Sequence, residues 1–166
     1  MSGWPDDIEN KAQALITAFS KRGLMVATAE SCTGGLIAGA LTEIPGSSSV
    51  VDRGFVTYSN DAKMQMLGVD PATLAAHGAV SRQTAIEMAR GALTHSKADI
   101  AVAVTGIAGP GGGSNEKPVG LVHLATASRG GNVLHREMRY GDIGRDAVRM
   151  ATVRTALDML DEAAGS

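Results

Sequence analysis

The sequence has few aromatic residues, a single cysteine and no long apolar run. Aromatic side chains make up 3% of the 166 residues although 44% are hydrophobic, so we expect a core of Ala, Val, Leu, Ile and Met. The lone Cys32 excludes an intramolecular disulfide and is typical of a reducing compartment. No apolar run approaches the roughly 20 residues that span a bilayer, and no secretion signal opens the chain. We therefore predict a cytoplasmic protein without a membrane partner.

The charge balance argues against two further classes of protein. The chain has 15 Lys and Arg residues and 17 Asp and Glu residues, which give a net charge of -2. Its overall charge therefore provides no electrostatic attraction to nucleic acid, and we expect no direct nucleic-acid partner. Four histidines, His77, His95, His123 and His135, lack the spacing of metal ligands. We predict no structural metal, and the length predicts one domain over residues 1–166.

Apolar periodicity predicts alternating helices and strands. Helices are expected over residues 6–22, 36–41 and 142–160, over short stretches after Asn60 and Asp70, and over a longer one capped by Ser81. Strands are expected over residues 24–27, 50–58 and 99–105, followed by a hairpin of residues 119–127 and 132–140. This order predicts a three-layer α/β/α sandwich with a mixed β-sheet.

The segment Thr28-Ala29-Glu30-Ser31-Cys32-Thr33-Gly34-Gly35 is the strongest functional signal. It is predicted as a polar turn where a strand feeds a helix, and in open α/β sheets ligands bind at that end of a strand. Ser31 is the leading candidate nucleophile, and an ordinary helix N-cap is the equally good alternative. Cys32 is a weaker candidate because a lone cysteine is more often a small buried residue.

A serine nucleophile needs a base, and neither glycine-rich turn supplies a histidine. Lys63 lies one turn into the short helix that follows Tyr58, so both side chains can project to one region. A lysine acts as a base only if burial or nearby positive charge lowers its pKa toward neutrality. The alternatives are a solvated helix lysine and a half-buried tyrosine at a strand end.

A second glycine-rich turn follows the predicted strand 99–105. The stretch from Gly106 to Ser114 lacks the ending of a P-loop, and a strand rather than a clear helix follows it. A ligand-binding backbone and a flexible surface loop both fit this pattern. Arg145 and Arg149, near the start of the last helix, are candidate phosphate partners, or else solvated arginines.

Four ordered motifs together resemble the CinA C-terminal domain family, over about residues 8–163. They are Ala29-Glu30-Ser31-Cys32-Thr33-Gly34-Gly35, Gly54-Phe55-Val56-Thr57-Tyr58-Ser59-Asn60-Asp61-Ala62-Lys63, His77-Gly78-Ala79-Val80-Ser81, and Thr105-Gly106-Ile107-Ala108-Gly109-Pro110 through Lys117-Pro118-Val119-Gly120. The resemblance implies an α/β/α amidohydrolase that converts nicotinamide mononucleotide (NMN) to nicotinate mononucleotide and ammonia, without a cofactor.

The resemblance also implies roles for single residues. Ser31 would be the nucleophile, Lys63 the general base and Tyr58 their helper. We expect backbone around Thr33, Gly34 and Gly35 to hold the oxyanion, and Thr105, Gly106, Ala108, Gly109 and Arg145 to contact ribose and phosphate. A noncatalytic nucleotide-binding module and a competence-related regulatory module are the alternatives. The small-residue helices also permit a homo-oligomer.

Overall fold

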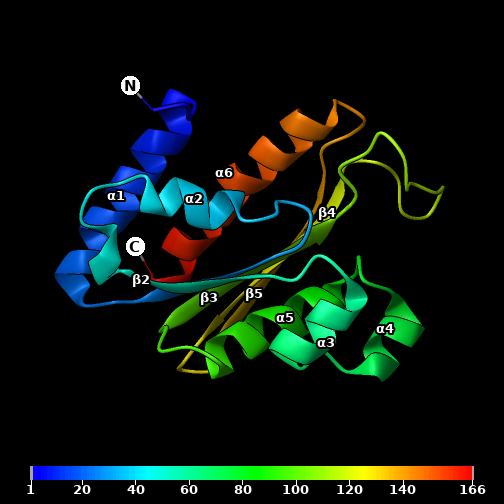
Figure 1. Cartoon of the computed structure of the whole chain (residues 1–166), viewed down its shortest axis with the longest axis horizontal. Coiled ribbons are helices and arrows are strands. Elements are labelled where there is room, and N and C mark those ends of the chain that lie inside the picture. Colours follow the sequence, from blue (N-terminus) through cyan, green and yellow to red (C-terminus); the bar gives the residue numbers. More distant parts are fainter. Residues whose placement is uncertain (1, 166) are drawn as a thin grey trace.

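The computed structural model describes residues 2–165, which form a five-stranded sheet between two helical layers (Figure 1). The predicted α/β/α sandwich with a mixed sheet is therefore confirmed. The elements in chain order are α1 (Asp6–Arg22), β1 (Val26–Glu30), α2 (Leu36–Thr42), the 3-10 turn η1 (Ser47–Ser49), β2 (Val51–Val56), α3 (Asn60–Leu67), α4 (Pro71–His77), α5 (Arg82–Thr94), β3 (Ile100–Gly106), β4 (Leu121–Ser128), β5 (Val133–Arg139) and α6 (Arg145–Ala163).

The strand order β2-β1-β3-β4-β5 explains where a ligand can bind. β1 pairs in parallel with both β2 and β3, and β4 runs antiparallel to β3 and to β5. The chain leaves β1 toward one side of the sheet and later returns on the other side as β3. Such a reversal opens a crevice at the carboxyl ends of the strands. Ser31 directly follows β1, and Gly106 ends β3, at this edge.

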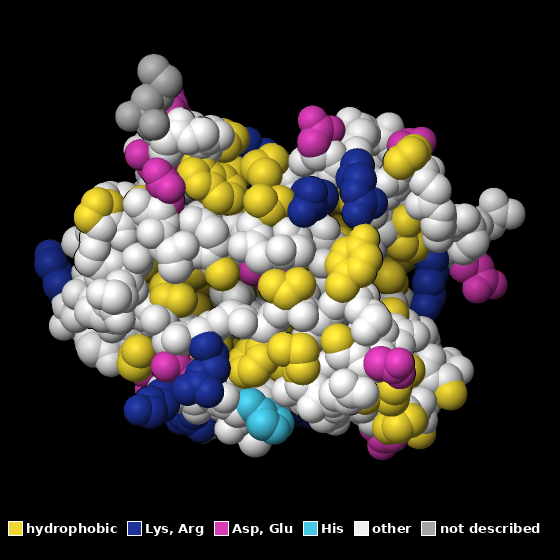
Figure 2. Space-filling model, viewed as in Figure 1, with side chains coloured by type: hydrophobic (Ala, Val, Ile, Leu, Met, Phe, Trp, Pro, Cys, Tyr) yellow, Lys and Arg dark blue, Asp and Glu magenta, His cyan; other side chains and the backbone are white. Residues whose placement is uncertain are grey.

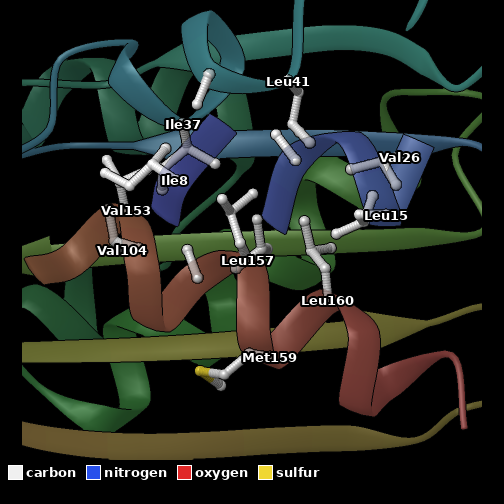
Figure 3. Close-up of a cluster of buried hydrophobic side chains, with 14 of the residues drawn as sticks. Ile8, Leu15, Val26, Ile37, Leu41, Val104, Val153, Leu157, Met159 and Leu160 are labelled. Atoms are coloured by element: carbon white, nitrogen blue, oxygen red, sulfur yellow. The ribbon is translucent and has the colours of Figure 1, made fainter. Parts of the chain in front are cut away.

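Each face of the sheet has its own core. Helices α1, α2 and α6 cover one face, where Ile8, Ile37 and Leu157 belong to the same buried cluster as Val26 and Val104 of the sheet (Figure 3). Helices α3, α4 and α5 cover the opposite face (Figure 1). There the core consists largely of alanines from α5, β1, β3 and β4, and such small side chains let a helix approach the sheet closely. The predicted core of aliphatic and small residues is confirmed.

Capping explains where several helices begin and end. In α1 the first turn carries Asp6 and Asp7, and Gly23 ends the helix in the left-handed conformation at φ 67°. The predicted cap of α5 is confirmed, because Ser81 Oγ accepts the Thr84 N–H at 3.2 Å. The helices within residues 2–165 lack the combination of length and apolar character that a membrane span requires.

Several predicted boundaries are wrong, and β2 ends at Val56 rather than at residue 58. Thr28 to Glu30 belong to β1 rather than to a turn, because their polar side chains are buried at the end of the strand. Helix α3 begins at Asn60 rather than after it, because Ser59 caps the helix by accepting the Ala62 N–H. Helix α6 begins only at Arg145. The preceding Gly144 has a φ angle of 101°, and such a positive φ favours glycine.

Candidate active site

Ser31 lies at the carboxyl end of β1, where its N–H donates to the Val104 carbonyl of β3 at 3.1 Å. The chain then turns through Gly34 and Gly35, whose φ angles of 56° and 108° suit glycine. Helix α2 begins after Gly35 and has no side-chain cap. The N-cap alternative for Ser31 is therefore wrong, and its largely buried hydroxyl is directed elsewhere.

Lys63 reaches the Ser31 hydroxyl although 32 residues separate them. Its side chain is 1% exposed, and Nζ donates to Ser31 Oγ at 3.0 Å, to the Thr57 carbonyl at 2.9 Å and to the Tyr58 carbonyl at 3.4 Å. The lysine sits in the first turn of α3, which follows β2 directly. The parallel pairing of β1 with β2 thus brings the two side chains together.

Burial sets the acid–base properties of this pair. It lowers the pKa of the Lys63 amine below its ordinary value of 10.5, because an ammonium loses hydration in the interior. Within residues 2–165 no carboxylate forms an ion pair with Lys63 to counteract this effect. Burial also raises the pKa of the Cys32 thiol to about 11, helped by the nearby Glu30 charge. Cys32 is thus a protonated thiol, which disfavours it as the nucleophile.

A cavity of about 200 Å³ opens beside the Ser31–Lys63 pair. Five further predicted site residues line it: Tyr58, Thr105, Gly106, Ala108 and Arg145. Sequence reasoning missed three more: Asn60, Ala79 and Val80. One small polar cavity therefore lies where the carboxyl ends of β1, β2 and β3 meet α3, the segment before α5 and the start of α6.

Arg145 and Tyr58 meet at this cavity. The Arg145 guanidinium donates to the Tyr58 hydroxyl at 3.0 Å and to the Gly109 carbonyl at 3.0 Å. The Tyr58 side chain is 62% exposed. Tyr58 therefore contacts Lys63 through its carbonyl, whereas its hydroxyl contacts Arg145. Gly109 takes part through its carbonyl and is not among the cavity-lining residues.

Thr105 fixes the segment that sequence reasoning missed. Its Oγ1 donates to the Ala79 carbonyl at 2.9 Å, which holds the residues before α5 against the end of β3. The predicted helix cap at Ser81 could have indicated this segment, because it marks where the chain leaves the edge of the sheet and enters α5.

The residues predicted to bind the oxyanion lie beside the cavity rather than in its wall. The Thr33 hydroxyl donates to Glu30 Oε1 at 2.6 Å, and the Gly34 N–H donates to the Ser31 carbonyl at 3.0 Å. Thr33, Gly34 and Gly35 are not among the lining residues. Arg149 donates to the carbonyls of Cys32 and Thr33, so its guanidinium binds the turn, which the sequence did not predict.

The glycine-rich loop after β3 borders a different hollow. Residues 110–115 line an open groove of about 600 Å³ together with Arg139 and Asp142, and the loop projects from the body of the molecule (Figure 1). Lys117 Nζ donates to the His77 carbonyl at 2.6 Å, which ties this loop to the end of α4.

Two of the four histidines, His123 and His135, contact each other across the β4–β5 hairpin. His123 Nδ1 and His135 Nε2 are 2.9 Å apart, and the rings stack with centroids 5.2 Å apart. Burial is the main cause that lowers the pKa of both rings. Within the described part of the chain, no three His, Cys, Asp or Glu side chains group as metal ligands.

The surface offers no broad basic region on the face that Figure 2 draws. Lys and Arg side chains occur there in small groups, with acidic side chains interspersed. Sustained nucleic-acid binding uses a continuous basic surface, which this face lacks.

Comparison with known proteins gives consistent matches. The CinA C-terminal domain family matches residues 8–164. Nicotinamide-nucleotide amidohydrolase PncC of Escherichia coli K12 is 56% identical over 144 residues, covering 86% of each chain. A putative competence-damage inducible protein of Caldicellulosiruptor bescii is 52% identical over 149 residues, which are 89% of this chain and 36% of that longer protein.

Solved structures also match along nearly the whole chain. A crystal structure of competence/damage inducible protein CihA from Agrobacterium tumefaciens superposes with a TM-score of 0.97 at 73% identity, covering 98% of both chains. A CinA superfamily protein from Klebsiella pneumoniae 700603 has a TM-score of 0.88 at 39% identity, covering 93% of this chain and 96% of that one.

Proposed function

The chain belongs to the CinA C-terminal domain family, and from that premise we propose that it is an amidohydrolase acting on nicotinamide mononucleotide. The products are nicotinate mononucleotide and ammonia. The observation that carries the mechanism is the 3.0 Å contact between Ser31 Oγ and the buried Lys63 amine. A hydroxyl with a base in hydrogen-bond reach is the arrangement that nucleophilic catalysis of acyl transfer requires.

In the working state Lys63 is neutral. An ammonium has three donors, and the three oxygens around Nζ accept them. The neutral amine retains two donors for the Thr57 and Tyr58 carbonyls and turns its lone pair toward Ser31. It then accepts the hydroxyl proton while Oγ attacks the carboxamide carbon, and a tetrahedral oxyanion forms.

The turn after Ser31 provides the backbone N–H groups for this oxyanion. The Gly34 N–H is bonded to the Ser31 carbonyl, whereas Cys32 both follows the nucleophile and lines the cavity. We therefore assign the Cys32 N–H as the first oxyanion donor, in place of the Thr33 to Gly35 groups.

Collapse of the tetrahedral intermediate breaks the carbon–nitrogen bond. The proton held by Lys63 passes to the departing amide nitrogen, which leaves as ammonia, and the acyl group remains on Ser31. Water then attacks the ester with Lys63 as base, releasing the carboxylate and restoring the hydroxyl. The Tyr58 hydroxyl is our second candidate for delivering a proton at the cavity.

The size and polarity of the cavity suit the pyridine carboxamide end of the substrate. A volume of about 200 Å³ is smaller than that of most sites that enclose a whole drug-sized ligand, so the ribose and phosphate extend past Tyr58 and Arg145. Arg145 presents a forked cation there. In this proposal residues 1–166 act as one cytoplasmic amidohydrolase domain, as a monomer or homo-oligomer, without nucleic acid or cofactor.

The test is ammonia release from NMN by the wild type and by Ser31→Ala and Lys63→Ala. We expect wild-type turnover and a loss of at least about 100-fold in each variant. Ser47→Ala, at a buried serine outside the cavity, and Lys97→Ala are the matched controls and should stay active. Saturable NMN binding without ammonia release would instead support a noncatalytic nucleotide-binding module. Near wild-type turnover by Ser31→Ala would remove the Ser–Lys mechanism.

A further inference from the structure

We propose that Arg149 is a positioning residue for catalysis, which works together with Glu30 to fix the turn that carries Ser31. This inference rests on the proposed function. Neither residue lines the cavity, so neither is expected to touch the substrate. Arg149 binds two carbonyl groups of the turn, whereas Glu30 binds the Thr33 hydroxyl and two N–H groups of helix α2.

Arg149 reaches the turn from α6, more than a hundred residues along the chain. Its Nε donates to the Cys32 carbonyl at 3.1 Å, and its Nη2 donates to the Thr33 carbonyl at 3.2 Å. A Cβ added at Gly34 would lie 3.4 Å from Nη2, so the guanidinium lies directly against the turn. The fork of Arg149 therefore binds two successive carbonyls, which a lysine cannot match.

Glu30 binds the same segment with a carboxylate that is 1% exposed. Oε1 accepts the Thr33 hydroxyl at 2.6 Å and the Ile37 N–H at 2.8 Å, and Oε2 accepts the Ala38 N–H at 3.0 Å. Both oxygens thus have partners in the turn or in the helix that follows it. Charge-assisted bonds of this kind are stronger than neutral ones.

Fixing the carbonyls also fixes the N–H groups, because each peptide unit is planar. Arg149 holds the plane that joins Cys32 to Thr33 and the plane that joins Thr33 to Gly34. The second plane carries the Gly34 N–H that donates to the Ser31 carbonyl. The Ser31 carbonyl that accepts this bond shares its peptide plane with the Cys32 N–H, the oxyanion donor assigned above. Through these linked planes the guanidinium sets the position of Ser31 relative to Lys63 and the direction of the Cys32 N–H, without contacting the reacting atoms.

The decisive experiment measures NMN hydrolysis by Arg149→Ala. A displacement of about 1 Å at a reacting group costs about 100-fold in rate, so we expect kcat to fall by about 10- to 100-fold with KM within about twofold of wild type. Because Arg149 is only half-buried, guanidinium ion added well below denaturing concentrations should restore part of kcat. In a plot of kcat against pH, the acidic limb, which we attribute to deprotonation of Lys63, should keep the midpoint that it has in the wild type.

Three further variants complete the design. Arg149→Lys should resemble Arg149→Ala, because an ammonium cannot bind both carbonyls. Glu30→Gln keeps the shape of the side chain and should lower kcat without raising KM. Arg154→Ala is the matched control: it lies on α6 and pairs with Asp7, so it should keep wild-type kcat.

Each contrary result overturns the inference. Unchanged kcat in Arg149→Ala would show that the contact does not matter, and a raised KM with unchanged kcat would make Arg149 a substrate ligand. A lower melting temperature with no rescue by guanidinium ion would make its role purely structural.

Acylation of Ser31 by p-nitrophenyl acetate, followed by mass spectrometry, separates this inference from the proposed function. If the wild type releases no ammonia from NMN but is acylated faster than Arg149→Ala, the proposed substrate is wrong and the positioning role stands. Equal acylation rates would refute the positioning role, whatever the substrate.

Discussion

The pH dependence of hydrolysis tests the role of Lys63 most directly. At its ordinary pKa of 10.5, a lysine has only about one part in 3,000 in the neutral form at pH 7. Each unit by which burial lowers the pKa raises that fraction tenfold. Lys63 is 1% exposed and pairs with no carboxylate among residues 2–165, so its pKa shift is downward.

We therefore expect kcat to rise about tenfold per pH unit on the acidic side and to level off well below pH 10.5. Ammonia should be measured in quenched samples, so that no coupling enzyme adds its own pH dependence. The NMN phosphate also titrates near pH 6. Nicotinamide riboside, which lacks the phosphate, should show the same Lys63 limb without that contribution.

Lys63→Arg is the matched variant, because it keeps a positive charge that cannot be removed in this range. It should lose at least about 100-fold in kcat at every pH. A flat wild-type profile from pH 5.5 to pH 9 would contradict the assignment of Lys63 as the base. So would a retained pH limb in Lys63→Arg, since the titrating group would then be another residue.

Three further predictions concern stability. The pKa of Lys63 is lower in the folded than in the unfolded chain, so the unfolded chain binds more protons and the free energy of unfolding should increase with pH up to about 10.5. In urea titrations over this range the wild type should gain about 1.4 kcal/mol, relative to Lys63→Met, for each unit by which folding lowers the Lys63 pKa. No gain would refute the pKa shift. The pKa values of His123 and His135 are also lowered in the folded chain, so stability should fall as the pH drops below about 6.5. In thermal unfolding, the melting temperature of His135→Gln should fall less steeply with pH than that of the wild type. Gly91→Ala would place a Cβ 2.0 Å from the Leu67 carbonyl oxygen and should cost about 1–3 kcal/mol in urea unfolding, so an unchanged midpoint would contradict this packing.

Local patterns predicted most of the fold. The apolar face of α1, from Ile8 to Phe19, repeats at helical spacing, and every member is buried as expected. The hairpin of β4 and β5 turns at the predicted Ser128 to Gly131, where the Gly131 N–H donates to the Ser128 carbonyl. These features depend on neighbours in sequence, which is why periodicity and turn chemistry predict them.

The same reasoning misplaced polar residues that are buried in the sheet. Thr28 and Glu30 were predicted in a turn because they are polar, yet both lie in β1. The partners that satisfy the Glu30 carboxylate belong to the following turn and helix, and no local pattern shows that their N–H groups point back to the strand.

Sequence patterns predicted seven of the residues that line the cavity, missed Asn60, Ala79 and Val80, and did not predict the contacts between side chains. Spacing alone left Ser31 and Lys63 in their ordinary roles, because their contact depends on how β1 and β2 pair. Arg145 and Arg149 looked alike in sequence, as two arginines one turn apart. In the structure one contacts Tyr58 and the other contacts the turn after Ser31, a difference decided by how α6 docks.

The long-range contacts of α6 have a consequence for how activity depends on folding. Arg145 on α6 contacts Tyr58 at the cavity, and Arg149 contacts the turn after Ser31 although more than a hundred residues separate them. Strands β1 and β3 can therefore pair before either contact exists. Under the proposed function, hydrolysis should begin only once α6 has docked against the sheet.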